Sequence, residues 1–185
     1  MKKLRILKWT VRSLILLAVA AFLLYYPWPC RINVSEKLLV WENTHAGGST
    51  ETEWRDVTVK GVFKNSILGE DSFEVKELSI EGVELDAPDG DWSVTGFQNN
   101  WHYLIYAYVE SPGKASHQFV GTMYHSVGRP HFVITLSKDL DPSDGPDGTW
   151  VTDKIITYPA KTREEAVALT RKIVADCGWK DTIWE

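Results

Sequence analysis

An uncharged, strongly apolar segment near the N-terminus constrains this chain more than any other feature. It runs from Ser13 to Trp28 as SLILLAVAAFLLYYPW and stays uncharged as far as Cys30. A helix that crosses a membrane needs about 20 apolar residues, with a lower limit of about 17. The sequence therefore predicts a short membrane-spanning helix over residues 13–30, retained in the protein as a signal anchor.

Residues suited to the membrane interface flank this segment at both ends. Trp and Tyr are enriched where a helix passes the headgroup layer, and the long Arg side chain can carry its charge out to that layer. The interface residues expected here are Trp9, Arg12, Tyr25, Tyr26 and Trp28. Two prolines then end the helix, because proline cannot donate the next backbone hydrogen bond.

Charge sets the expected orientation. Five of the 20 basic residues precede Ser13, and none of the 25 acidic residues does. Basic flanks stay on the cytoplasmic side. We therefore expect residues 1–12 to be a cytoplasmic basic segment of a single-pass cell-membrane protein, with the C-terminal part extracytoplasmic.

Three other interpretations of the segment compete with the anchor. A cleaved signal peptide also has a basic start and an apolar centre, and Ala18-Val19-Ala20 resembles a cleavage site. A lipoprotein would be acylated at Cys30, but bulky residues precede that cysteine. A buried core helix is disfavoured by the basic cluster in front and the prolines behind.

After a short linker at 31–36, residues 37–185 are expected to fold as one domain rich in strands. Alternating or continuous apolar runs bounded by Gly, Pro, Asn and Asp are typical of strands. The expected strands are 37–42, 54–63, 72–83, 92–97, 101–110, 117–124, 131–136 and 150–158. In 72–83 the apolar phase changes, which indicates a bulge or a break. The run 101–110 is apolar in both phases, so we expect it at the centre of the sheet.

One helix is expected in this domain, at 162–177. Thr162 and Glu165 have the spacing of a capping box, and Gly178 follows where a helix C-cap belongs. Apolar residues recur at helical spacing and need a sheet to cover them. The predicted fold is mainly β (α+β): an antiparallel sheet or sandwich of about seven to eight strands with the C-terminal helix packed on it.

The acidic loop between the last two expected strands is a candidate calcium site. Carboxylates between glycines can surround Ca²⁺ with oxygen ligands. The candidate ligands are Asp139, Asp141, Asp144 and Asp147. Their spacing is not that of an EF-hand, and a solvated turn uses the same residue types, so calcium competes with a plain loop.

Histidines offer a second candidate metal site. His117, His125 and His131 lie on or beside two neighbouring expected strands and could converge on Zn²⁺. No helical His pair of a metalloprotease occurs. Histidines at strand edges without a metal are the alternative.

Cys30 and Cys177 are the two cysteines of the chain. In an oxidising compartment they could form a disulfide, which requires the C-terminal helix to pack close to the anchor. The alternative is two free thiols. No Gly-x-Ser-x-Gly motif for a nucleophilic serine is present, so no catalytic residue is assigned.

Several aromatic residues of the domain could stack against a sugar or peptide if they were exposed together. They are Trp92, Trp101, Tyr106, Tyr108 and Tyr124. The alternative is that they pack in the core and across strands.

These features favour a membrane-anchored, non-enzymatic module that binds a protein, peptide or envelope component. The acidic balance of the domain disfavours nucleic acid. One alternative is a small membrane-tethered hydrolase or metal-dependent enzyme built from scattered His and Asp residues. Another is an accessory subunit that acts through its membrane helix.

Overall fold

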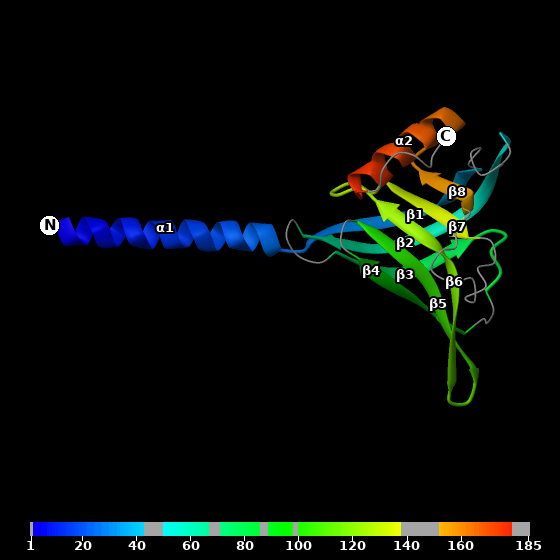
Figure 1. Cartoon of the computed structure of the whole chain (residues 1–185), viewed down its shortest axis with the longest axis horizontal. Helices are drawn as coiled ribbons and strands as arrows, with labels where there is room; N and C mark the ends of the chain where they lie inside the picture. The colour runs from blue at the N-terminus through cyan, green and yellow to red at the C-terminus, as the bar shows by residue number, and fades with distance from the viewer. Residues whose placement is uncertain are drawn as a thin grey trace.

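The computed structural model describes residues 2–42, 50–66, 71–85, 89–97, 100–137 and 152–178, and it contains an extended N-terminal helix and a β-rich domain (Figure 1). Helix α1 (Lys2–Tyr25) is followed by eight strands and a second helix. The strands are β1 (Trp28–Trp41), β2 (Thr52–Asn65), β3 (Ser72–Ile80), β4 (Asp91–Phe97), β5 (Trp101–Ser111), β6 (Lys114–His125), β7 (Phe132–Ser137) and β8 (Thr152–Tyr158). Helix α2 (Arg163–Asp176) comes last.

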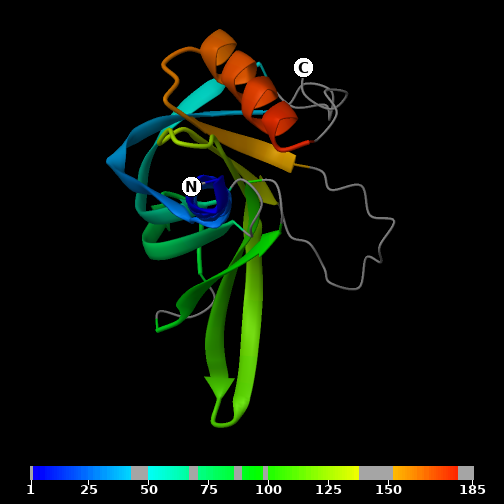
Figure 2. The ribbon, with the colours of Figure 1, turned by 90° about the vertical axis from the view of Figure 1, so that its left-hand side faces the viewer.

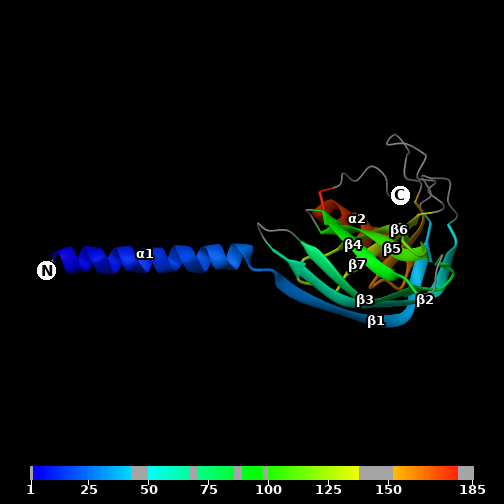
Figure 3. The ribbon, with the colours of Figure 1, turned by 90° about the horizontal axis from the view of Figure 1, so that it is seen from below.

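The strands form one antiparallel sheet in the order β3-β2-β1-β8-β7-β6-β5-β4. Two meanders are joined where the end of β1 pairs with β8, at Val40–Ile156 and Trp41–Ile155. The sheet curls so that its two outer strands, β3 and β4, come close to each other and nearly close it (Figures 2 and 3). The predicted fold of an antiparallel sheet with one covering helix is confirmed, as a single curled sheet.

The curled sheet has an inner core, made by side chains that alternate with outward-facing ones along each strand. Its largest fully buried members include Phe63, Phe132 and Leu104. In β3 the inward phase changes between Val75 and Leu78, because Lys76 has no partner in the register of β2. The predicted phase change is therefore a β-bulge within one strand, not a break into two.

Helix α2 covers the outer face of the sheet across β1, β6, β7 and β8 (Figure 2). Ala166, Ile173 and Val174 are buried against a second apolar cluster that includes Trp41 and Ile155. Thr162 caps the helix by accepting a hydrogen bond from the Glu165 backbone N–H at 3.2 Å. The helix prediction for 162–177 is confirmed, with Thr162 and Cys177 as its caps.

Three details of the predicted organisation are wrong. Helix α1 ends at Tyr25, since Pro27 and Pro29 cannot continue it, and residues 31–36 belong to β1 and not to a linker. Ile32 and Val34 alternate into the inner core, so β1 begins well before residue 37. Strand β5 is the second strand from one edge, not a central one.

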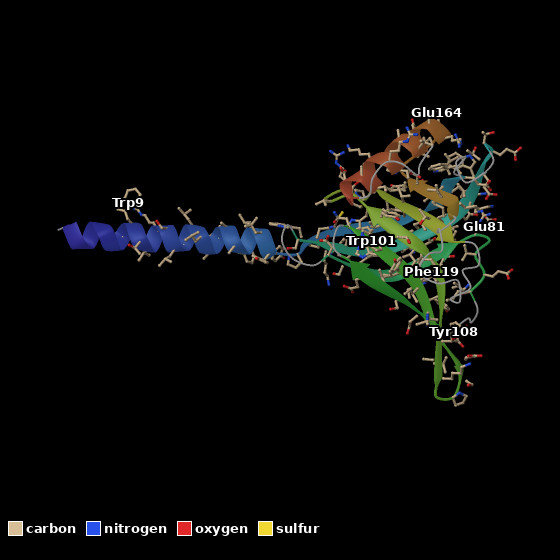
Figure 4. All side chains as sticks on the ribbon, in the orientation of Figure 1. Trp9, Glu81, Trp101, Tyr108, Phe119 and Glu164 are labelled. Atoms are coloured by element: carbon tan, nitrogen blue, oxygen red, sulfur yellow. The ribbon has the colours of Figure 1, made fainter. Side chains whose placement is uncertain are left out.

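The span Lys8–Tyr25 of α1 is long and apolar enough to cross a membrane, judged by its length and composition alone. None of this span is buried against the domain. Trp9 lies towards its N-terminal end (Figure 4), as does Arg12, and Tyr25 is at the other end, shortly before Tyr26 and Trp28 in the chain.

Gly121 marks a place where two strands approach too closely for a side chain. A Cβ built there would overlap the carbonyl oxygen of Thr135 on β7. We expect Gly121→Ala to destabilise the domain by about 1–3 kcal/mol, since the backbone must shift to admit the methyl group. Thermal unfolding followed by circular dichroism measures this effect. The exposed Ala115→Ser on the same strand serves as the control, and an unchanged melting temperature of Gly121→Ala would contradict the prediction.

Candidate functional site

The polar side chains buried inside the sheet gather at one end, which we call the α1 end. There β1 begins at Trp28, opposite the last residue of β2, Asn65. Asn65 donates from Nδ2 to Oδ1 of Asn100 at 2.6 Å. The Asn100 carbonyl in turn accepts from the backbone N–H of His125 at 3.0 Å. These bonds connect β2, the start of β5 and the end of β6.

Two histidines form the centre of this group. His102 and His125 are both fully buried, and their Nε2 atoms are 3.2 Å apart. The rings are nearly parallel, with 2° between their planes, and the ring of Phe63 stacks on His125 at a centroid distance of 3.8 Å. Because strand residues alternate, His102 and His125 both face inward and lie diagonally across the β5–β6 pair.

The hydrogen bonds assign the protons of this histidine pair. His125 Nδ1 lies 3.5 Å from the carbonyl oxygen of Ser126, which can only accept, and this contact favours the tautomer that has its proton on Nδ1 and an acceptor at Nε2. His102 must therefore donate from Nε2 to His125 Nε2. This leaves His102 Nδ1 as an acceptor, and it is one of the buried side-chain atoms without a partner among the described residues.

Burial keeps both rings neutral at pH 7. It lowers the pKa of His102 to about 4. The pKa of His125 falls to about 3, because of burial and then the neighbouring His102, although the Ser126 carbonyl opposes the shift. A neutral, enclosed pair cannot take a proton from a ligand in solvent without opening of the domain. Its evident role is to join β5 and β6 at the α1 end.

The candidate zinc cluster is not formed. His125 faces the inner core, His117 is exposed on the outer half of β6, and His131 lies beyond the β6–β7 turn. The described residues contain no group of three or more His, Cys, Asp or Glu side chains that could hold a metal ion. The candidate calcium ligands Asp139, Asp141, Asp144 and Asp147 lie outside the described residues.

The disulfide considered from the sequence is not formed, and both cysteines are free. Cys30 packs on the inner core, whereas Cys177 belongs to the outer cluster under α2, so the sheet separates them. The Cys177 thiol donates to the Asn100 carbonyl at 3.4 Å. Burial is the largest cause that raises the pKa of Cys177 to about 12.

This environment predicts unequal thiol reactivity. Thiolate is the reactive form, and burial raises the pKa of both thiols, but Cys177 is fully buried and Cys30 only half-buried. Cys177 should therefore resist alkylation in the folded protein at pH 8, whereas Cys30 should react faster. Mass spectrometry after timed iodoacetamide treatment, with and without urea, measures both rates. Rapid labelling of Cys177 without urea would contradict this expectation.

The aromatic residues do not form one stacking platform. Trp92 and Tyr106 pack in or against the inner core, with ring centroids 5.3 Å apart. Tyr124 and Trp101 belong to the outer cluster. These aromatic residues are therefore distributed between the two faces of the sheet, in agreement with the alternative that they pack in the core and across strands.

Sequence reasoning missed the histidine pair and the two asparagines. The available signal was that His102 shares the phase of Leu104 and Tyr106, which both face inward. Comparison of the chain with family models, with curated proteins and with solved structures finds no match.

Proposed function

We propose that this protein is a single-pass, membrane-anchored accessory module, with its N-terminus in the cytoplasm and its β domain outside. The observation that carries the proposal is the exposed apolar span Lys8–Tyr25, none of which the domain covers. Such a helix finds its apolar environment in lipid. The basic residues that precede the span support the orientation.

The join between α1 and the sheet makes the end of the helix part of the domain. The last carbonyl groups of a helix have no partner within it. Here Trp28 Nε1 donates to the Leu23 carbonyl at 3.3 Å, and the Ser66 hydroxyl, just after β2, donates to the Leu24 carbonyl at 3.1 Å. The domain thus supplies the end cap of α1, so helix and domain are joined by hydrogen bonds as well as by the chain.

Retention is tested on the full chain with a C-terminal tag. We expect the mature protein to stay in the membrane fraction after alkaline carbonate extraction, with an intact mass that includes residues before Ala18. A soluble product that begins just after Ala20 would overturn the anchor. Protease added outside the cell should digest the domain, and full protection would reverse the proposed orientation.

The β5–β6 hairpin is the best-placed element for a protein partner. It extends to one side of the domain, roughly perpendicular to α1 (Figures 1 and 2). Among the described strands, β4 pairs with β5 only as far as Ala107, and β7 pairs with β6 only from Gly121 onwards. Between these two residues, β5 and β6 pair only with each other. Val109 near its tip is 69% exposed. A hairpin held parallel to the membrane surface would reach a neighbouring membrane or envelope protein.

A photo-crosslinking amino acid at Val109 tests this role in intact cells. We expect a discrete adduct at this position and no such adduct at Glu164, which is exposed on α2 (Figure 4). The adduct should also disappear when an unlabelled copy of the full chain is overexpressed. Equal crosslinking at both positions, or none at Val109, would refute the role of the hairpin in partner binding. The proposal that α1 is a membrane anchor would not be affected.

A further inference from the structure

The turn between β6 and β7 lies at the α1 end. A continuous series of contacts places it there: Leu24 of α1 accepts from Ser66, the adjacent Asn65 binds Asn100, and the Asn100 carbonyl accepts from His125 N–H. His125 is the last residue of β6 and leads into the turn. Figures 1 and 2 show the turn on the side of the domain from which α1 leaves.

Val127 in this turn is an exposed apolar side chain, with 63% of its surface accessible. After Trp28, the other large apolar side chains that are exposed within the described residues are Trp54 and Val109. Trp54 lies near the far end of β2, opposite Leu39, and Val109 lies on the projecting hairpin. Of these three exposed apolar residues, Val127 is the one that lies at the α1 end.

Two cationic side chains lie near the β6–β7 turn, within electrostatic reach of His131. Arg129 is in the turn, two residues after Val127, and Lys172 is on α2; both are exposed. Both are close enough to His131 to lower its pKa, after the larger effect of burial. Of the acids at this end, Asp71 accepts from the Ser66 backbone N–H at 3.0 Å, and Asp176 is exposed at the end of α2.

We propose that the β6–β7 turn is a second membrane contact, in which Val127 enters the headgroup layer and Arg129 and Lys172 bind anionic phospholipid headgroups. The inference rests on the proposed function, because α1 must cross that same bilayer. An apolar side chain with cations around it is the combination that favours an anionic lipid surface. The contact would fix the tilt of the domain, even though acidic residues outnumber basic ones in the chain as a whole.

Depth-dependent quenching in liposomes tests the contact. The full chain, with Cys30→Ser and Cys177→Ala, receives one cysteine at a time for a fluorescent label: Leu16→Cys in α1, Val127→Cys in the turn, or Val109→Cys in the hairpin. Val109 is the matched control, because it is the same residue type with similar exposure. Circular dichroism first confirms that each variant folds. Phospholipids with a nitroxide in the headgroup region or along the acyl chain supply the quencher.

We expect quenching of the labels at Leu16 and Val127 and not at Val109. Quenching at Leu16 alone would overturn the turn contact while α1 remained an anchor. Absence of quenching at Leu16 would overturn the anchor, and the inference with it. Equal quenching at Val127 and Val109 would also overturn the inference, because the domain would then lie on the membrane without preference for the turn.

The charge requirement is tested separately. In liposomes with an anionic phospholipid, Arg129→Gln should lower the ratio of inserted to free turn by about fivefold, and Lys172→Gln by a similar factor. Lys114→Gln, which makes the same charge change at the hairpin tip, should have no effect. Insertion that is equal in zwitterionic and anionic liposomes would refute the headgroup part of the inference.

Discussion

Lowering the pH from 7 to 5 is expected to destabilise the domain by about 4 kcal/mol, because the two buried histidines contribute about 2 kcal/mol each. In the unfolded chain both rings have the ordinary pKa of 6.5, whereas in the folded protein burial lowers the pKa of His102 to about 4 and that of His125 to about 3. Between these values the unfolded chain binds more protons than the folded one. The contribution of the histidines to stability is therefore complete above about pH 6.5 and decreases as the pH falls, down to about 4 for His102 and about 3 for His125.

Urea unfolding of the full chain in detergent at pH 7, 6 and 5 measures this loss. Hydrogen bonds from Lys154 and Lys64 are the largest causes that lower the pKa values of Glu53 and Glu74 below the ordinary 4.5, so their effect on stability belongs mainly to lower pH. Burial also lowers the pKa of His131, which acts in the same direction as the buried pair. The double variant His102→Leu/His125→Met should lose most of the pH dependence. His117→Asn, which changes an exposed histidine, should retain it. A transition midpoint that does not move between pH 7 and 5 would contradict the assignment of a neutral pair.

Local signals in the sequence were sufficient for α2 and for the bulge in β3. Helix α2 depends on a capping threonine and on apolar residues at helical spacing, which both act within a few residues. The bulge at Lys76 appears as a change in the phase of the apolar residues, which also needs no knowledge of the partner strand. Elements of this kind can be predicted because their causes are close together in the chain.

The start of β1 and the position of β5 depend on distant residues and were predicted wrongly. Residues 31–36 of β1 include Arg31, Ser35 and Glu36, so their composition resembles a linker. It becomes a strand because it pairs with β2 along its whole length. Strand β5 is apolar in both phases because one face meets the inner core and the other includes Trp101, which packs near α2. A strand with two apolar faces can therefore lie next to the edge of the sheet, as β5 does.

The histidine pair shows the same limit for the site. The phase of β5 indicated that His102 faces inward, but its partner is 23 residues away in the chain. The direction and distance of that partner follow from the β5–β6 register, where His102 pairs with Met123. The sequence grouped His125 with His117 and His131 by proximity in the chain. The register shift of β6 at Val120 puts His117 and His125 on different faces of the strand, and the turn separates His131 from both.

Phe63→Ala is expected to be the most damaging single substitution at the α1 end, with a loss of about 3–5 kcal/mol in the free energy of unfolding. Phe63 is fully buried, and its ring packs between Phe73, at a centroid distance of 4.1 Å, and His125, at 3.8 Å. Its removal takes away buried apolar surface and leaves a cavity beside the histidine pair. Phe119→Ala on the outer face, where the side chain is only half-buried, should cost much less (Figure 4).

The same substitution should weaken the pH dependence of stability. Water that enters the cavity beside His125 would solvate its charged form, and the pKa of the ring would rise towards its ordinary value. Phe63→Ala should therefore lose less stability between pH 7 and 5 than the natural chain, whereas Phe119→Ala should lose as much. Urea unfolding of both variants at the two pH values separates the effects. An unchanged pH dependence in Phe63→Ala would mean that the neutral state of the histidine pair does not depend on the cover of Phe63, and that the rest of the inner core is sufficient to exclude water.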